Sequence, residues 1–242
     1  MDIALIGYGK MGKEIEKIAQ ERGHKIVLKI HGENLQALNE SNLQMADVAI
    51  EFSRPEAAAT NVWKCIEAGI PVVSGTTGWQ DKMEEIKEFC EEKNGSFLWA
   101  SNFSIGVNIF FKLNKYLAKL MRNFPEYKID ITEVHHTQKL DAPSGTAITL
   151  AETINEIHPI QQTWRLIEHK QQVENHQIPI HAKRVNNTPG THEVHYRSEI
   201  DNLDLIHTAH NRKGFALGAI IAAEFIVNKK GIFDLEEVFF KE

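Results

Sequence analysis

Residues 2–12 read Asp2-Ile3-Ala4-Leu5-Ile6-Gly7-Tyr8-Gly9-Lys10-Met11-Gly12, a short apolar strand that leads into a glycine-rich turn. The glycines form a strict G-x-G-x-x-G pattern where the strand ends and the first helix begins. In this pattern Gly7 permits the tight turn, Gly9 lets a pyrophosphate approach the backbone, and Gly12 allows helix and strand to pack closely. Unpaired N–H groups at the helix start face the anion. The stretch therefore predicts a dinucleotide-binding unit.

The alternation of strand and helix continues to about residue 100. Strands are predicted over 3–6, 25–30, 47–52, 71–74 and 96–100, and helices over 11–22, 55–68 and 80–93. Strict alternation implies right-handed crossovers between parallel strands. We therefore expect an α/β fold with a Rossmann-like, doubly wound parallel sheet.

The pattern changes after Asn102. A helix is predicted over 106–123, then a strand over 128–135, a helix beginning near Thr146, and strands over 178–185, 192–198 and 203–210. Successive strands without helices indicate a mixed or antiparallel sheet, hence a second, α+β domain. A largely apolar helix over 215–227 is expected to return to the first domain. The predicted division is a discontinuous dinucleotide-binding domain, 1–105 and 212–242, and a substrate-binding domain, 106–211.

Composition limits the class of protein. The 242 residues are 42% hydrophobic and 25% charged, as in ordinary globular proteins. A net charge of −6 argues against a nucleic-acid partner, which needs a basic face. No run approaches the roughly 18 apolar residues of a membrane span, so no membrane association is expected. The two cysteines, Cys65 and Cys90, are expected to be free thiols in a cytoplasmic protein.

The choice between NADH and NADPH depends on the end of the second strand, where an acidic residue would hold the adenine ribose hydroxyls. Here the sequence reads Lys29-Ile30-His31-Gly32-Glu33. Lys29 or His31 could instead face a ribose phosphate, and Glu33 could fold back toward the ribose. The sequence predicts NADH or NADPH as cofactor and leaves the preference open.

A second glycine-rich turn, Ser74-Gly75-Thr76-Thr77-Gly78, follows the fourth predicted strand. It falls at the carboxyl edge of the sheet, where ligands bind doubly wound folds. Its two threonine hydroxyls and flexible backbone suit contact with the nicotinamide half of the cofactor. A plain strand-to-helix connection would favour the same residue types.

The segment richest in chemistry is Glu133-Val134-His135-His136-Thr137-Gln138-Lys139-Leu140-Asp141-Ala142-Pro143-Ser144-Gly145-Thr146. It leaves a predicted strand, carries two imidazoles and an ammonium group, and ends in a turn that opens a helix. The helix start offers N–H donors to an anion, and Lys139 adds a full charge. One imidazole could donate a proton while the other binds a carboxylate. The segment predicts a site for a carboxylate-bearing small molecule, although two ordinary histidines are the alternative.

No metal site is expected. His192 and His195, and likewise His207 and His210, are three residues apart. On a strand this spacing turns the two rings to opposite faces, whereas zinc needs ligands that converge. A cysteine pair and the H-E-x-x-H motif are also missing from the sequence.

Five segments occur in an order that resembles the bacterial 4-hydroxy-tetrahydrodipicolinate reductase family. They are residues 7–12, 74–78, 101–107, 135–146 and 215–219. The run from His135 to Thr146 is the most distinctive, because many enzymes share the glycine-rich loop. The resemblance spans nearly the whole chain.

The resemblance implies a nicotinamide-dependent reductase of lysine and diaminopimelate synthesis, which acts on a cyclic imine dicarboxylate and forms a homotetramer through its second domain. It implies that His135 or Lys139 supplies the proton. Residues implied to hold the substrate carboxylates are His136, Ser144, Gly145 and Thr146. Residues implied or predicted to contact the cofactor are Gly7, Tyr8, Gly9, Lys10, Met11, Gly12, Gly75, Thr76, Thr77, Asn102 and Phe103. The family often has an extra residue in the first loop and an arginine where Lys10 stands.

Two other classes of protein fit part of the pattern. A semialdehyde dehydrogenase shares the two-domain plan but needs a nucleophilic thiol, and both cysteines fall in predicted helices of the first domain. A redox-sensing regulator would bind the dinucleotide without chemistry, but it would need a DNA-binding helix-turn-helix and a basic face.

Overall fold

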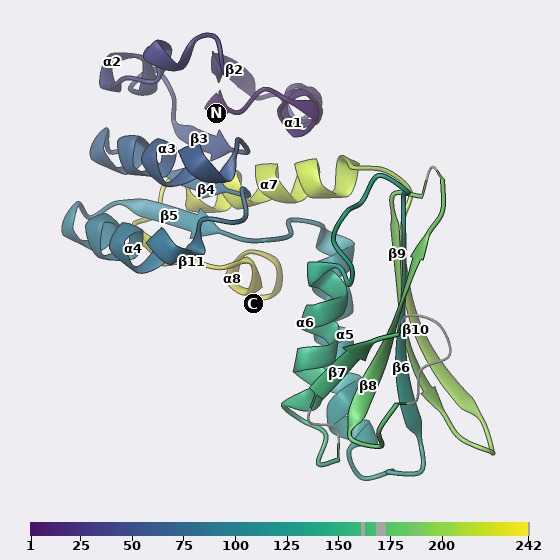
Figure 1. Cartoon of the computed structure of the whole chain (residues 1–242). Coiled ribbons are helices and arrows are strands. Elements are labelled where there is room, and N and C mark those ends of the chain that lie inside the picture. Colours follow the sequence, from purple (N-terminus) through teal and green to yellow (C-terminus); the bar gives the residue numbers. More distant parts are fainter. Residues whose placement is uncertain (161–162, 168–172, 187, 242) are drawn as a thin grey trace. The chain divides into compact units, whose positions relative to one another are not determined.

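The computed structural model describes residues 1–160, 163–167, 173–186 and 188–241, which fall into two compact units (Figure 1). The first unit comprises 1–108 and 212–242, and the second comprises 109–211. The division lies within helix α5 (Ile105–Met121). No helix in the described residues is both long enough and apolar enough to span a bilayer.

The first unit contains a six-stranded sheet whose strands are all parallel, in the order β11-β5-β4-β3-β1-β2. The strands are β1 (Asp2–Ile6), β2 (Lys25–Ile30), β3 (Val48–Glu51), β4 (Val72–Ser74), β5 (Ser96–Trp99) and β11 (Gly231–Phe233). The predicted Rossmann-like, doubly wound sheet is confirmed. Strand β11 was not predicted, because it lies outside the strand–helix alternation that ends near residue 100.

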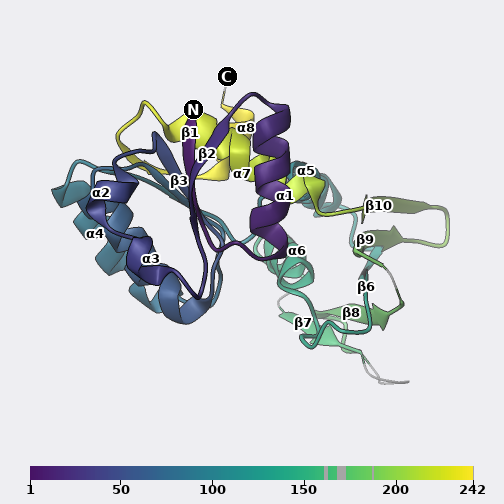
Figure 2. The same ribbon diagram turned by 90° about the horizontal axis from the view of Figure 1, so that it is seen from above.

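Helices cover both faces of this sheet (Figure 2). They are α1 (Lys10–Glu21), α2 (Glu40–Leu43), α3 (Pro55–Glu67), α4 (Met83–Glu92), α7 (Lys213–Ile226) and α8 (Leu235–Phe240), with short 3-10 turns η1 (Leu35–Ala37) and η2 (Gln80–Lys82). Alternate residues of β1 enter different cores: Ile3 and Leu5 pack with α1 and α7, whereas Ala4 and Ile6 pack with α3 and α4. Strands buried on both sides explain the nearly continuous apolar runs of the sequence.

The second unit contains a five-stranded mixed sheet in the order β10-β9-β6-β8-β7. The strands are β6 (Lys128–His135), β7 (Thr163–Leu166), β8 (Gln177–Arg184), β9 (Gly190–Arg197) and β10 (Asn202–Ala209). Strands β6, β8 and β7 are parallel, whereas β9 and β10 are antiparallel to their neighbours. Helices α5 and α6 (Gly145–Asn155) contribute, with the sheet, to one apolar core. The expected mixed sheet is present, with β7 as an additional strand.

Candidate functional site

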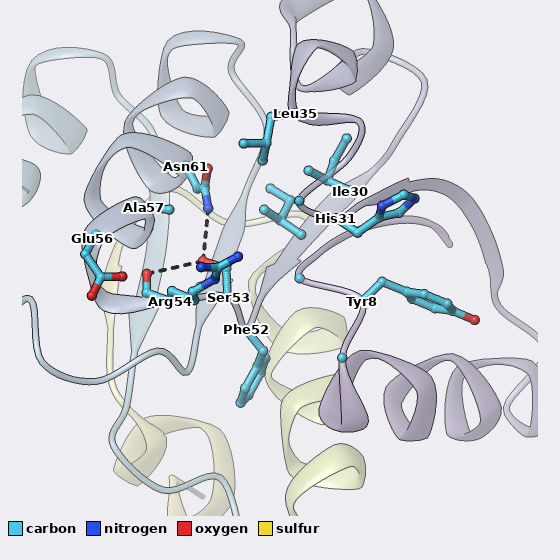
Figure 3. Close-up of a pocket in the computed structure, with 14 residues that line it drawn as sticks. Tyr8, Ile30, His31, Leu35, Phe52, Ser53, Arg54, Glu56, Ala57 and Asn61 are labelled. Atoms are coloured by element: carbon cyan, nitrogen blue, oxygen red, sulfur yellow. Dashed lines mark hydrogen bonds between the residues drawn. The ribbon is translucent and has the colours of Figure 1, made fainter.

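A cavity of about 530 Å³ lies at the carboxyl ends of β1, β2 and β3 in the first unit (Figure 3). This volume is within the usual range for small-molecule sites. The cavity is lined by Ile6, Gly7, Tyr8, Gly9, Ile30, His31, Gly32, Leu35, Phe52, Ser53, Arg54, Glu56, Ala57 and Asn61. The glycine-rich loop predicted to bind a dinucleotide therefore forms one wall of a cavity at the edge where such folds bind ligands.

Each glycine of the loop meets a different steric demand. Gly7 has φ +97°, and a Cβ added there would lie 2.0 Å from the carbonyl oxygen of Phe52. A Cβ on Gly12 would lie 2.3 Å from the carbonyl oxygen of Gly7, whereas a Cβ on Gly9 would have no neighbour within 4 Å. Gly7 and Gly12 are thus required by packing, and the space above Gly9 is open to a ligand.

The start of α1 is suited to an anion. Gly9 occupies the N-cap position, no side chain caps the helix, and its first turn holds no acidic residue. The first N–H groups of a helix have no partner within the helix, so here they can bind a phosphate. Lys10, the first residue of α1, is exposed, and Met11 packs partly against the apolar core. These observations fit a pyrophosphate above Gly9.

Behind the loop, a buried carboxylate organises the second glycine-rich turn. Glu51 at the end of β3 is fully buried and accepts hydrogen bonds from the hydroxyls of Ser53, Ser74 (2.6 Å) and Thr76 (2.9 Å). The carbonyl oxygen of Thr76 also accepts bonds from the indole N–H groups of Trp79 (2.7 Å) and Trp99 (2.8 Å). The Thr76 hydroxyl therefore holds the turn in place, and a cofactor would meet the backbone of this turn and exposed Thr77.

The other predicted cofactor contacts occupy different environments. A Cβ on Gly75 would come within 2.2 Å of the Phe52 ring, so that ring closes the turn. Phe103 is buried, with its ring centroid 5.6 Å from that of Phe52. The side-chain oxygen of Asn102 accepts a bond from the N–H of Ser104 (2.9 Å). Cofactor contact by Asn102 and Phe103 remains a prediction.

In the second unit, strand pairing gathers charged side chains at the end of β6. His135 and Glu133 are two residues apart, and the register places His192 of β9 opposite Glu133 and Arg184 of β8 opposite His135. The Nδ1 atom of His135 is 3.0 Å from a carboxylate oxygen of Glu133. This distance is short enough for an ion pair, but the two atoms do not meet the angles of a hydrogen bond. The guanidinium of Arg184 donates to the other oxygen over 3.1 Å.

Glu133 is fully buried, and its pKa is about 2. Burial by itself raises this pKa, but contacts with His135, Ser144 and Arg184 outweigh burial and favour the carboxylate. The group is therefore ionised throughout the physiological pH range. It supplies a fixed negative charge beside the imidazole of His135.

His192 completes the buried part of this cluster. Its ring lies edge-on to that of His135, with centroids 5.0 Å apart, and its Nε2 atom is 3.1 Å from the hydroxyl of Ser144. Burial lowers the pKa of His192 to about 3, with the nearby His135 as a second cause. His192 is thus neutral at neutral pH, so the two rings do not carry competing charges.

The cation and the helix start predicted for substrate binding lie on the following loop and on α6. The ammonium group of Lys139 donates to both carboxylate oxygens of Asp141, over 2.8 Å and 2.7 Å. Ser144 caps α6 by accepting from the N–H of Ala147 (3.2 Å), and a Cβ on Gly145 would have no neighbour within 4 Å. Open space therefore faces the helix start at Gly145, while the Ser144 hydroxyl points into the buried cluster.

The two histidines of the predicted pair have different surroundings. His135 is buried beside Glu133, whereas His136 follows the end of β6, and its carbonyl oxygen accepts from the N–H of Lys139 (3.1 Å). The Nδ1 atom of His136 is buried and has no hydrogen-bond partner in the described part of the chain. The assigned roles of both histidines stay predictions.

The cluster also brings three possible metal ligands together. Glu133, His135 and His192 each offer an atom within 4.8 Å of the others. The sequence argument considered histidine pairs within one strand and could not anticipate a set formed across two strands. The guanidinium of Arg184 beside Glu133 adds a positive charge that opposes a cation. That no metal binds remains a prediction.

Neither cysteine resembles a nucleophile. Cys65 and Cys90 are free and buried, as expected for structural thiols. Burial raises the pKa of both thiol groups, with a nearby glutamate as a second cause. A raised pKa keeps a thiol protonated and unreactive, which argues against thiol catalysis.

Sequence reasoning missed several residues that the structure places at these sites. Arg54 and Asn61 line the cavity of the first unit, and Arg184 and Glu133 belong to the cluster of the second. Glu133 had a local signal, because a residue two positions before His135 on a strand shares its face. Arg184 had none, since only the pairing of β6 with β8 brings it near.

Comparisons with known proteins agree with the resemblance. Residues 1–103 match the family model for the dihydrodipicolinate reductase N-terminus, and 106–239 match the model for its C-terminus. A 4-hydroxy-tetrahydrodipicolinate reductase from Christiangramia forsetii is 50% identical over 239 residues, which cover 98% of this chain and 97% of that protein. One from Alkaliphilus oremlandii is 33% identical over 244 residues and 98% of each chain.

A solved structure shares the fold. Dipicolinate-bound dihydrodipicolinate reductase from a Paenisporosarcina species has a TM-score of 0.76 at 24% identity, and the match covers 97% of each chain. The sequence matches extend over both units and include the glycine-rich loop and the His135–Thr146 segment. The chain belongs to the dihydrodipicolinate reductase family.

Proposed function

We propose that this protein reduces 4-hydroxy-tetrahydrodipicolinate to tetrahydrodipicolinate with NADH or NADPH, as a step of lysine and diaminopimelate synthesis. One observation carries the proposal: Lys139 and the open helix start at Gly145 lie on the segment that follows His135. The imidazole of His135 is itself paired with the buried carboxylate of Glu133. This arrangement offers two anion-binding groups and a proton donor to one small molecule. The identity of 50% to a relative of that name supports the same substrate.

The first unit binds the cofactor in this proposal. The N–H groups at the start of α1 hold the pyrophosphate above Gly9, and the cavity beyond them takes the adenosine half. The backbone of the turn at Gly75 and Thr76, fixed by Glu51, faces the nicotinamide half. Bound reduced nicotinamide would supply a hydride to a ring carbon of the substrate. The ring hydroxyl leaves as water, a proton is taken up, and the product keeps its ring imine.

The second unit binds the substrate and controls its proton. The N–H groups of Gly145 and Thr146 donate hydrogen bonds to one carboxylate, and His136 and Lys139 contact the substrate as further polar groups. His135 or Lys139 donates the proton, an action that typically contributes about 10²- to 10⁴-fold to a rate. Glu133 acts as a positioning residue, because its fixed charge orients the imidazole of His135.

The direct test is a spectrophotometric assay at 340 nm with purified full-length protein. Dihydrodipicolinate synthase generates the unstable substrate in the cuvette, and oxidation of NADH or NADPH is recorded. We expect oxidation that depends on both the synthase and its substrates. No oxidation with either cofactor would overturn the proposed reaction.

Replacement of Lys139 tests the site. We expect Lys139→Ala to lower kcat/KM about 100-fold or more, because it removes an anion-binding group and a candidate proton donor. Cofactor affinity, measured by quenching of protein fluorescence, should stay unchanged. Lys128→Ala is the matched control, since Lys128 is an exposed lysine at the start of β6, whereas Lys139 lies on the loop that follows the end of this strand. Turnover near the wild-type value in Lys139→Ala would contradict the role.

The same proposal includes a cytoplasmic homotetramer that forms through the second unit. In support, α5 exposes large apolar side chains at positions that share one side of the helix, namely Ile109, Leu113, Tyr116 and Leu120, and β10 exposes Leu203 and Ile206. Such apolar surface is typical of a subunit interface. Light scattering of the purified protein tests the subunit number.

A further inference from the structure

The cavity of the first unit holds an arginine that the proposed reaction does not use. Arg54 occupies the N-cap position of α3, where its carbonyl oxygen accepts bonds from Ala57 and Ala58, both over 3.0 Å. These bonds fix the backbone, and the side chain extends toward the end of β2. One of its terminal nitrogens lies 3.7 Å from the point where a Cβ on Gly32 would stand.

The position of this guanidinium matters because the end of the second strand is where dinucleotide folds distinguish the two cofactors. A carboxylate there binds the ribose hydroxyls of NADH, whereas an arginine accommodates the 2′-phosphate of NADPH. The cavity runs from Gly7 and Gly9, below the pyrophosphate position, to His31, Gly32 and Arg54. A cofactor with its pyrophosphate on α1 would place its adenosine ribose beside Arg54.

The charges around this end of the cavity favour an anion. In the described part of the chain, the guanidinium of Arg54 has no carboxylate partner, and exposed His31 stands on the opposite wall. Glu33 does not line the cavity, and Lys29 is bound to Glu16 over 2.6 Å. Glu56 does line it, but Figure 3 shows Glu56 on the opposite side of the cavity from His31.

We propose that this protein prefers NADPH to NADH, and that Arg54 determines the preference by binding the 2′-phosphate, with His31 beside it. The inference rests on the proposed function, which requires a nicotinamide cofactor, and adds which of the two cofactors the protein prefers. A guanidinium and a phosphate form charge-assisted, often bidentate hydrogen bonds. NADH, which carries a hydroxyl at that position, leaves Arg54 without a partner.

The sharpest test uses fragments that carry the distinguishing group and need no catalysis. Isothermal titration calorimetry compares 2′,5′-ADP with 5′-AMP on the full-length protein. We expect wild type to bind 2′,5′-ADP about tenfold more tightly or better. Arg54→Ala should bring the ratio close to one, and Arg54→Lys should restore part of it. The preference should also weaken as salt is raised.

Arg122→Ala is the matched control, because it removes one exposed arginine from the chain beyond the end of α5. It should keep the wild-type ratio. Equal binding of the two fragments by wild type, or an unchanged ratio in Arg54→Ala, would overturn the inference. Circular dichroism verifies that each variant is folded.

The same variants in the kinetic assay separate this inference from the proposed reaction. We expect Arg54→Ala to reduce kcat/KM for NADPH about tenfold more than kcat/KM for NADH. Turnover that favours NADH would contradict the proposed preference for NADPH but would support the proposed reaction. Selective binding of 2′,5′-ADP without turnover of the dicarboxylate would support the preference for NADPH but contradict the proposed reaction.

Discussion

The two candidate sites of this molecule are built by opposite means. In the first unit, the loop of Gly7, Gly9 and Gly12 presents its backbone to the cavity and depends on the absence of side chains. In the second, the end of β6 depends on charged side chains, with Glu133 and His135 at its centre. One added methyl group should therefore disrupt the candidate site of the first unit, and the loss of one charge should disrupt that of the second.

The largest effect is expected from a methyl group at Gly12. Its Cβ would stand 2.3 Å from the carbonyl oxygen of Gly7, a backbone atom that cannot move aside alone. We expect Gly12→Ala to lower the free energy of unfolding by about 3 kcal/mol or more. Gly9→Ala is the matched variant, because its Cβ meets nothing within 4 Å.

The free energy of unfolding of Gly9→Ala should lie within about 0.5 kcal/mol of the wild-type value. The variant should nevertheless bind NADPH about tenfold more weakly, since the methyl group enters the pyrophosphate position. Urea denaturation and fluorescence titration of both variants make the comparison. Equal losses of unfolding free energy at the two positions would contradict the assignment of Gly12 to packing and of Gly9 to ligand binding.

The next effect is expected from the buried charge of the second unit. Glu133→Gln keeps the shape of the side chain but leaves Arg184 and His135 without their carboxylate. We expect a loss of about 3 kcal/mol in unfolding free energy at pH 7. Activity should also fall, because the imidazole of His135 loses the group that orients it.

This loss should depend on pH. The folded pKa of Glu133, about 2, is below its ordinary value of 4.5. Its stabilisation is therefore present above pH 4.5 and disappears as the pH falls from there toward 2. Denaturation curves of wild type and Glu133→Gln should accordingly converge over that interval. Parallel curves over the whole range would contradict the assigned ion pairs.

The smallest effect is expected from Asp141, a carboxylate paired with a cation on the same loop but exposed to solvent. Its side chain is 61% exposed, whereas that of Glu133 is 0% exposed. Surface ion pairs contribute about 0–1 kcal/mol, so Asp141→Asn should change stability by less than 1 kcal/mol. KM for the substrate should fall, because Lys139 no longer has a competing carboxylate. A stability loss equal to that of Glu133→Gln would remove the contrast between the two carboxylates.

Local patterns predicted a large part of the fold. Strands 25–30 and 128–135 were predicted with the bounds that the structure has, because apolar and β-branched residues there are flanked by turns. Strands β7 and β11 were missed because neither belongs to the strand–helix alternation up to about residue 100, which revealed the equally short β3, β4 and β5. The glycine-rich loop was recognised because all of its parts lie within six consecutive residues.

The sites were predictable to the extent that their residues are neighbours in sequence. His135, Lys139 and Ser144 lie on one short segment, so their common role could be proposed from the sequence. Thr76 shows the limit of such reasoning. Its contact with the cofactor stays a prediction, and the sequence did not indicate that its hydroxyl donates to the buried carboxylate of Glu51.

By itself, the sequence determined the doubly wound class, the glycine-rich loop and the family, because these depend on short-range spacing and on segments in a given order. Tertiary structure decided which charges meet. Arg184 reaches Glu133 through the register of β6 and β8, and Arg54 reaches Gly32 because α3 begins beside the end of β2. Both contacts join residues more than 20 positions apart, and only the folded chain brings such residues within reach of each other.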